Sequence, residues 1–230
     1  MTTKRVGLVI MTQPDYDLPW VAALAAHCGK VFLVVNSPSL DRDLEDRIAD
    51  LLDGQCALEI IQADLSQTEG QGRLSDFIRQ RSPIHCVVNL YGYSLVPEAR
   101  PGTSVVSVKN TCFIEASMDG VLARVRRDID ATLLLSQVAL AGMKPLEEGL
   151  LLQVFVGHPE EGSLSPFSEA TAQFVEQFSE GLKRQLAPLY PQIAIQHARH
   201  SIVLTADGTA EALHTAKSLL ANASSSRNAR

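Results

Sequence analysis

The chain has 230 residues, 46% of them hydrophobic and 20% charged, and a formal net charge of -6. A chain of this length and composition buries a full hydrophobic core, which indicates one globular domain. The acidic balance and the scattered basic residues disfavour nucleic-acid binding, because neutralising phosphates requires a basic face. No apolar run reaches the roughly 18 residues of a membrane helix, and the first residues form no apolar leader. We therefore predict a cytoplasmic protein without a membrane or nucleic-acid partner.

Apolar runs typical of buried strands alternate along the chain with longer segments of helical periodicity. This alternation predicts right-handed βαβ crossovers and an α/β fold, namely a Rossmann-like, doubly wound parallel sheet of six to seven strands in a three-layer αβα sandwich. The predicted strands are 6–11, 31–35, 57–62, 86–90, 150–156 and 193–198. The predicted helices are 19–27, 40–52, 72–81, 121–143, 167–186 and 210–221.

The domain organisation follows from the same pattern. We expect a single Rossmann domain over residues 1–222, followed by a disordered, small and polar tail over 223–230. Residues 91–120 are rich in proline, glycine and serine and alternate like a short strand pair in their centre. This insertion is either a surface hairpin or a lid or docking element.

Cysteine and histidine spacing gives no metal signature. The four cysteines are far apart and include no CxxC pair, which favours reduced, buried thiols. Of the histidines, His197 and His200 alone lie near ligand spacing, and on a strand they point to opposite faces. We predict no metal site. The cysteines are Cys28, Cys56, Cys86 and Cys112.

The turn after the first predicted strand, residues 12–17, contains no glycine. A dinucleotide-binding turn carries several glycines, so that a pyrophosphate contacts backbone amides at the helix N-terminus. Asp17 is the expected N-cap of the following helix, and Asp15 adds a second carboxylate that would repel a pyrophosphate. From this turn we predict no cofactor and expect the chain not to bind NAD(P).

The order and spacing of the segments resemble the short-chain dehydrogenase/reductase (SDR) family over nearly the whole chain, most clearly between Asp64 and Ala198. "IIQADLSQ", with Asp64, is similar to the acidic strand end that contacts the adenine in that family. "CVVNLYGYS", with Asn89 and Gly92, resembles the strand that ends in Asn-Asn-Ala-Gly. The resemblance implies that these three positions are vestiges of a cofactor site. "DIDATLLLSQVALAGM", "GLLLQVFVG" and "PFSEATAQFVEQFSEGLKRQL" are similar to the interface helix, the serine strand and the Tyr-x-x-x-Lys helix.

The catalytic positions depart from the family pattern. The family needs a tyrosine beside a lysine for proton exchange with the substrate, and a serine hydroxyl that holds the substrate oxygen. No tyrosine in the chain is followed four residues later by lysine. The resemblance therefore implies a degenerate member. The tyrosine, lysine, serine and asparagine positions are occupied by Phe167, Thr171, Phe155 or Val156, and Asp128.

We therefore interpret the chain as a catalytically impaired pseudoenzyme, not a conventional NAD(P)-dependent oxidoreductase on its own. It would act as a non-catalytic subunit that associates with an active SDR subunit, or with itself, through two interface helices. An apolar stripe on the last long helix fits this role, although ordinary core packing explains the same stripe. The predicted interface residues are Gln137, Phe174, Phe178 and Leu182.

A second hypothesis keeps the pocket for other chemistry. The chain would be a non-redox dehydratase, isomerase or hydrolase with His158, Asp128 or Glu160 as the acid or base. A noncanonical ketoreductase-like oxidoreductase is a further alternative, since "GLKRQLAPLYPQIAIQ" resembles the end of polyketide-synthase ketoreductase domains.

Overall fold

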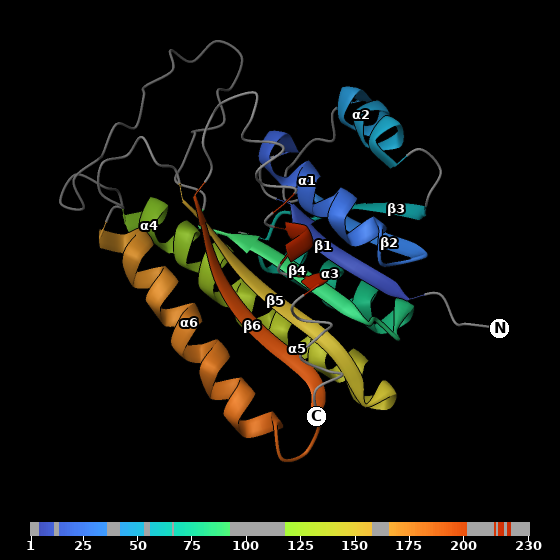
Figure 1. The fold of residues 1–230 in the computed structure, drawn as a ribbon. Helices are drawn as coiled ribbons and strands as arrows, with labels where there is room; N and C mark the ends of the chain where they lie inside the picture. The colour runs from blue at the N-terminus through green and yellow to red at the C-terminus, as the bar shows by residue number, and fades with distance from the viewer. Residues whose placement is uncertain are drawn as a thin grey trace, which may run out of the picture.

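The protein forms a single parallel sheet covered on both faces (Figure 1). A computed structural model describes residues 5–11, 14–35, 42–52, 56–65, 67–92, 118–157, 166–201, 214, 216–218, 220 and 221. The strand order is β3-β2-β1-β4-β5-β6, and every pairing is parallel. The strands are β1 (Val6–Met11), β2 (Lys30–Val35), β3 (Ala57–Gln62), β4 (Cys86–Tyr91), β5 (Glu148–Gly157) and β6 (Gln192–Ser201).

The helices divide between the two faces of the sheet. One core lies under α1 (Pro14–Ala25) and α2 (Arg42–Leu52), and the other lies under α3 (Thr68–Arg81), α5 (Ala131–Met143) and α6 (Pro166–Leu186). These three layers confirm the predicted αβα sandwich. In the described part of the chain, no helix combines the length and the apolar composition needed to cross a membrane.

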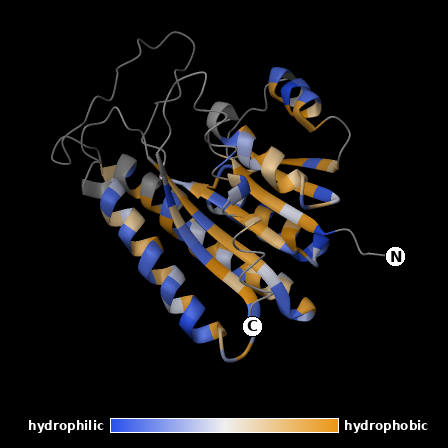
Figure 2. Cartoon of the chain, viewed as in Figure 1, coloured by the Kyte–Doolittle hydropathy of each residue, from blue (hydrophilic) through white to orange (hydrophobic). Residues whose placement is uncertain are grey.

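Strand β1 shows why the sheet has two cores. Val9 and Met11 belong to the core under α1 and α2, whereas Leu8 and Ile10 belong to the opposite core. Successive side chains on a strand point to opposite faces, so a strand buried on both sides needs an unbroken apolar run. Figure 2 shows this pattern as hydrophobic colouring along the central strands, while the outer side of α6 is largely hydrophilic.

The start of the first helix differs from the prediction. Helix α1 begins at Pro14, five residues before the predicted start at Pro19. Proline is favoured at the first helical position because its missing amide is unpaired there in any case. The prediction assigned that role to Pro19, whereas Pro14 holds it. Asp17 is therefore not the N-cap: it lies inside α1, and its side chain is fully buried.

The long predicted helix 121–143 is interrupted. It consists of α4 (Met118–Val125), a π-helical turn over Arg126–Asp130, and α5. Residues 93–117 and 222–230, with most of the predicted insertion and the whole predicted tail, lie outside the described residues. The description of the predicted helix 210–221 is limited to residues 214, 216–218, 220 and 221, which are helical.

The buried thiols give a first testable prediction. Cys28 and Cys86 are buried, and Cys56 is half-buried. Burial raises the pKa of the Cys28 thiol to about 12, so almost no thiolate is present at pH 8. We expect iodoacetamide to label Cys28 at least tenfold more slowly in the native protein than in urea, as measured by peptide mass spectrometry. Equal rates in the two conditions would contradict the burial of this side chain.

Candidate functional site

The candidate site lies at the carboxyl ends of β4 and β5, where open α/β sheets bind their ligands. Strand β4 ends at Tyr91, which pairs with Phe155 of β5. Gly92 follows with φ of 89°, a conformation that favours glycine. A Cβ atom at Gly92 would lie 2.3 Å from Phe155 Cε2. Glycine therefore lets the phenylalanine ring lie directly against the backbone at this edge.

An apolar cluster fills the space between the strand ends and α6. It consists of Tyr91, Phe155, Ala172 and Val175, and all four are buried. The Tyr91 and Phe155 rings meet edge to face, with centroids 5.7 Å apart. Phe155 stands at the predicted serine position, and its neighbour Val156 is buried as well. Neither side chain has a hydroxyl to hold a substrate oxygen.

Helix α6 carries the positions predicted for tyrosine and lysine. Thr171, at the lysine position, is 2% exposed. Its hydroxyl carries no charge, so it cannot lower the pKa of a neighbouring phenol as a lysine would. The backbone of Phe167 lies in the first turn of α6, and its side chain is outside the described part of the structure.

A buried hydrogen-bond network lies between β4, β5 and α5. The amide nitrogen of Asn89 donates to Thr132 Oγ1 over 3.0 Å and to Gln153 Oε1 over 2.7 Å. Gln153 in turn donates to Ser136 Oγ over 2.9 Å, and Ser136 donates to the carbonyl of Thr132 over 2.7 Å. Both amide hydrogens of Asn89 thus have protein partners, so this side chain ties the strands to α5.

Asp128 lies in the π-helical turn before α5 and is 5% exposed. Its carbonyl accepts a hydrogen bond from Thr132 Oγ1 over 2.6 Å, which connects the turn to Asn89. The carboxylate of Asp128 is near enough to Tyr91 to contribute to the raised pKa of that phenol. The structure therefore brings Asp128, Asn89 and Tyr91 to one place. π-Helical turns inside helices occur frequently at functional sites.

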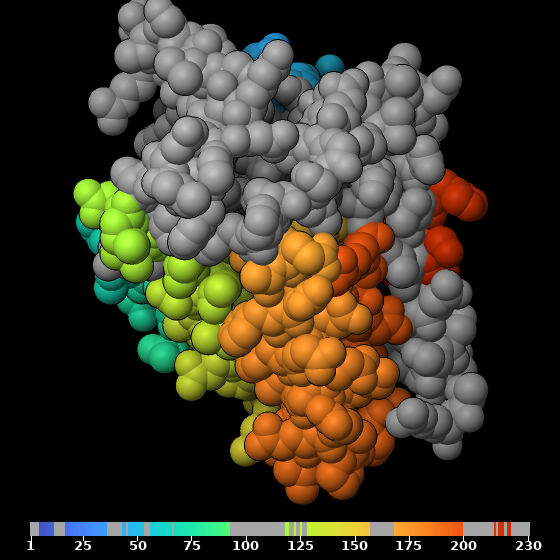
Figure 3. All heavy atoms as spheres, turned by 90° about the vertical axis from the view of Figure 1, so that its left-hand side faces the viewer, coloured from blue at the N-terminus to red at the C-terminus, as the bar shows by residue number. Residues whose placement is uncertain are grey.

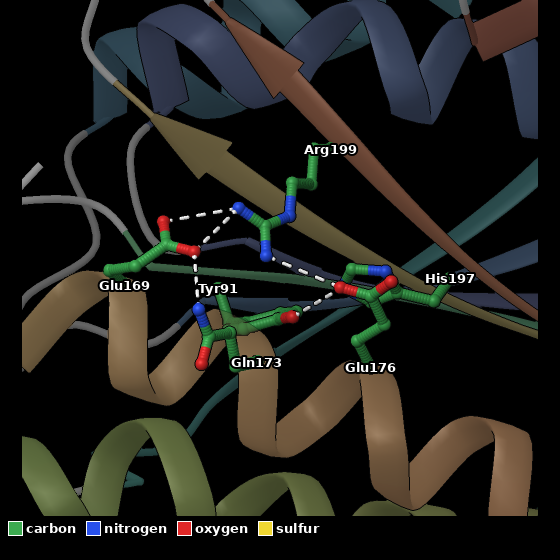
Figure 4. Close-up of polar contacts among 6 residues, drawn as sticks. All are labelled: Tyr91, Glu169, Gln173, Glu176, His197 and Arg199. Atoms are coloured by element: carbon green, nitrogen blue, oxygen red, sulfur yellow. Dashed lines mark hydrogen bonds and ion pairs between the residues drawn. The ribbon is translucent and has the colours of Figure 1, made fainter.

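The hydroxyl of Tyr91 forms a hydrogen bond that the sequence did not reveal (Figure 4). It lies 2.8 Å from Nε2 of His197 on β6. Desolvation by burial is the main reason that the pKa of Tyr91 is raised and that of His197 is lowered. The two residues are 106 positions apart, on strands that are not neighbours in the sheet.

Beside this pair, Arg199 joins β6 to α6. Its guanidinium donates to both carboxylate oxygens of Glu169, over 3.0 and 3.1 Å, and to Glu176 over 3.2 Å. Gln173 donates to the same Glu169 carboxylate over 3.0 Å (Figure 4). These bonds hold the pKa of Glu169 below its usual value.

The predicted interface residues fall into two groups. Gln137 and Phe174 are exposed, and the Phe174 ring stacks on the half-buried Phe178 with centroids 6.3 Å apart. Leu182 packs against the core under α6, as the core-packing interpretation expects. Figure 3 shows α6 beside the α4 and α5 segment on one face of the molecule.

Several other predicted positions can be placed briefly. Asp64 follows β3 and is half-buried. His158 and Glu160, the alternative acid or base residues, lie outside the described residues. Within the described ranges, no cluster of three or more histidine, cysteine or acidic side chains could hold a metal ion.

Three comparisons place the chain among known proteins. No protein-family model and no curated protein matches the sequence. Solved structures do match. A bulky-bulky ketone specific alcohol dehydrogenase from Comamonas testosteroni is 17% identical with a TM-score of 0.71, covering 96% of this chain and 84% of that one.

Several matching structures contain a nucleotide. A short-chain dehydrogenase from Sphingobium yanoikuyae in complex with NADPH is 18% identical, with a TM-score of 0.62, and the match covers 85% of this chain and 71% of that one. L-sorbose reductase from Gluconobacter frateurii, complexed with NADPH and L-sorbose, is 15% identical with a TM-score of 0.66, and the coverage is 89% and 72%.

These structures overturn the prediction that the chain has no cofactor. Its fold is shared with proteins that bind NADPH, so the absence of a glycine-rich turn is not sufficient to exclude NAD(P). The predicted repulsion of a pyrophosphate relied on the carboxylates of Asp15 and Asp17. Asp17 is buried inside α1 and is not displayed at the turn. Helix α1 begins three residues after β1 ends, at the carboxyl edge of the sheet, where free backbone amides favour an anionic group. The chain has the short-chain dehydrogenase/reductase fold.

Proposed function

We propose that this protein is a catalytically impaired member of the SDR fold that acts as a non-catalytic subunit. The apolar cluster around Phe155 carries the proposal. Reduction of a carbonyl needs a group that holds the oxygen and a group that gives it a proton. Phe155 and Val156 can do neither, and Thr171 has no charge with which to activate a phenol.

The fold family implies NAD(P), and the site is compatible with holding it. The half-buried Asp64 and the first turn of α1 are the elements that would contact it, since they lie at the carboxyl edge of the sheet. When bound, the reduced cofactor supplies a hydride. The residues around Phe155 would exclude water and substrate from the neighbouring space. Binding and turnover are therefore separate questions for this chain.

The retained task would be association through the exposed side of α6 and α5. Phe174 is 40% exposed, and its ring is held in a fixed orientation by stacking on Phe178. Exposed aromatic side chains on a helix are typical of protein interfaces. The partner would be a second copy of this chain or a homologous SDR subunit, as both would present helices of matching geometry.

A turnover assay tests the first part of the proposal. The purified chain is mixed with NADH or NADPH and a panel of ketones and aldehydes, and nucleotide oxidation is followed by absorbance. We expect no oxidation above the background without protein. Nucleotide binding is measured separately by fluorescence titration, so an inactive but folded chain is recognised. Steady turnover by the pure chain would contradict the proposal.

The association surface gives a prediction of its own. We expect Phe174→Glu to weaken association at least tenfold, because it places a charge in an apolar contact. Analytical ultracentrifugation measures the effect on the chain alone or with a candidate partner. Leu189→Glu is the matched control, since Leu189 is 66% exposed and follows the end of α6. If the two substitutions weaken association equally, or if Phe174→Glu does not weaken it, the prediction that α6 forms the interface is wrong.

One observation favours a second candidate, a non-redox enzyme. Asp128 places a buried carboxylate in a π-helical turn beside Tyr91, a setting that suits an acid or base. Native mass spectrometry of the protein from its own source separates the candidates. A homologous subunit supports the first, and a homo-oligomer carrying its own non-nucleotide ligand supports the second.

A further inference from the structure

The Tyr91 and His197 side chains form a polar contact beneath the first half of α6 (Figure 4). Tyr91 is 3% exposed, and its ring packs in the apolar cluster with Phe155, Ala172 and Val175. Among the described residues, the hydroxyl of Tyr91 forms its hydrogen bond with Nε2 of His197. The hydrogen bond therefore satisfies a buried polar group that lies directly under α6.

Charged groups from two elements surround His197. Glu176 and Glu180 face it from α6, and Arg199 faces it from its own strand. Tyr91 contacts His197 from β4. The negative charge of Asp128 contributes to the raised pKa of the Tyr91 phenol. Glu176 already accepts a hydrogen bond from Arg199. An added positive charge on His197 would compete with Arg199 for this one carboxylate.

Protonation would change both contacts. Neutral imidazole can accept the Tyr91 hydrogen at Nε2, whereas imidazolium can only donate there. The Tyr91 hydroxyl would then have to accept, and its own hydrogen would point into an apolar cluster without a partner. At the same time Glu176 would be drawn from Arg199 toward His197. The first change disturbs the contact between β4 and β6 that lies beneath α6. The second weakens the bond between Arg199 and Glu176, which ties α6 to β6.

We propose that the His197 and Tyr91 pair is a pH-sensitive latch, closed at neutral pH, that holds α6 in the form competent for association. The proposal rests on the proposed role of α6 as the interface helix. Acidification opens the latch and weakens association. Since burial lowers the pKa of His197, the change falls below pH 6.5. The folded state then prefers neutral imidazole, so its stability is complete above pH 6.5 and declines as pH falls through the folded pKa.

The substitution His197→Gln tests the latch, because the glutamine oxygen can still accept from Tyr91 but does not titrate. We expect the wild-type association constant to fall several-fold between pH 7.5 and 5.5, because the form competent for association disfavours protonated His197. His197→Gln should reduce this fall to less than twofold. His27→Gln, at an exposed histidine, should change as the wild type does. Sedimentation provides the constants.

Two results would overturn the latch. One is an equal pH response in the wild type and His197→Gln. The other is a His197 that stays neutral at pH 5, as reported by its NMR titration. If the wild type is monomeric at every pH, alone and with a candidate homologous subunit, the proposed function fails rather than the latch. Hydrogen exchange of the α6 amides then tests the latch independently. In the wild type, these amides should be less protected at pH 5.5 than at pH 7.5 once the rates are corrected for the intrinsic effect of pH. In His197→Gln, their protection should be the same at both pH values.

Discussion

Replacing Gly70 by alanine is expected to lower the free energy of unfolding by about 3 kcal/mol. Gly70 is the third residue of α3, and a Cβ atom there would lie 1.9 Å from the carbonyl oxygen of Asp64. The obstacle is backbone, which cannot rotate away as a side chain can. Helix α3 would have to move away from the end of β3. Its buried residues Leu74 and Ile78 would then lose contacts with the core on that face of the sheet.

The same helix provides the control. Gly72 lies two residues further along α3, and a Cβ atom there meets nothing within 4 Å. Gly72→Ala should therefore stabilise the protein by up to about 1 kcal/mol, because alanine favours helix over glycine. Urea unfolding followed by circular dichroism measures both variants. A Gly70→Ala protein as stable as Gly72→Ala would contradict the close contact between α3 and Asp64.

The second large effect concerns the buried network around Asn89. We expect Asn89→Leu to cost about 3 kcal/mol of unfolding free energy, since it removes the donor to the buried Gln153 Oε1 and one of the two hydrogen bonds of Thr132 Oγ1. Leucine has a similar volume, so a cavity contributes little. The loss would arise mainly from the hydrogen bonds, which a substitution by alanine would not isolate.

A double-mutant cycle identifies the cause. Gln153→Leu alone removes the acceptor of one Asn89 amide hydrogen and the donor to Ser136 Oγ. The double variant removes both partners of the bond between Asn89 and Gln153. The double variant should be more stable than the sum of the single losses predicts, by about 1 kcal/mol or more. Strict additivity in urea unfolding would show that the two amides do not depend on each other.

The fold was predictable because its signals are local. The strands 6–11 and 57–62 coincide with β1 and β3. In β1 an apolar run bounded by polar residues is enough to locate a buried strand, and in the half-buried edge strand β3 a short apolar segment interrupted by Glu59 was still sufficient. The start of α1 was not predictable, because two prolines competed for the first helical position. The π-helical turn leaves no mark in an apolar periodicity that continues through it.

The site is only partly accessible to sequence reasoning. Which residues stand at the catalytic positions stays a prediction from order and spacing. The contact of Tyr91 with His197 depends on side chains reaching across β5, which no local pattern encodes. The nucleotide prediction was wrong for a related reason. It treated one turn as decisive, although an entire sheet edge contributes to such a site.

Phe155, lying against Gly92, also bears on how this protein relates to reducing enzymes of the same fold. A serine at position 155 would restore a hydroxyl but would leave the space of an aromatic ring between Tyr91, Ala172 and Val175. Each neighbour would have to become larger before the new hydroxyl had a well-packed setting. Under the proposed function, this packing separates the two chemistries by several coordinated changes, so reductase activity would not be gained through single, equally stable steps.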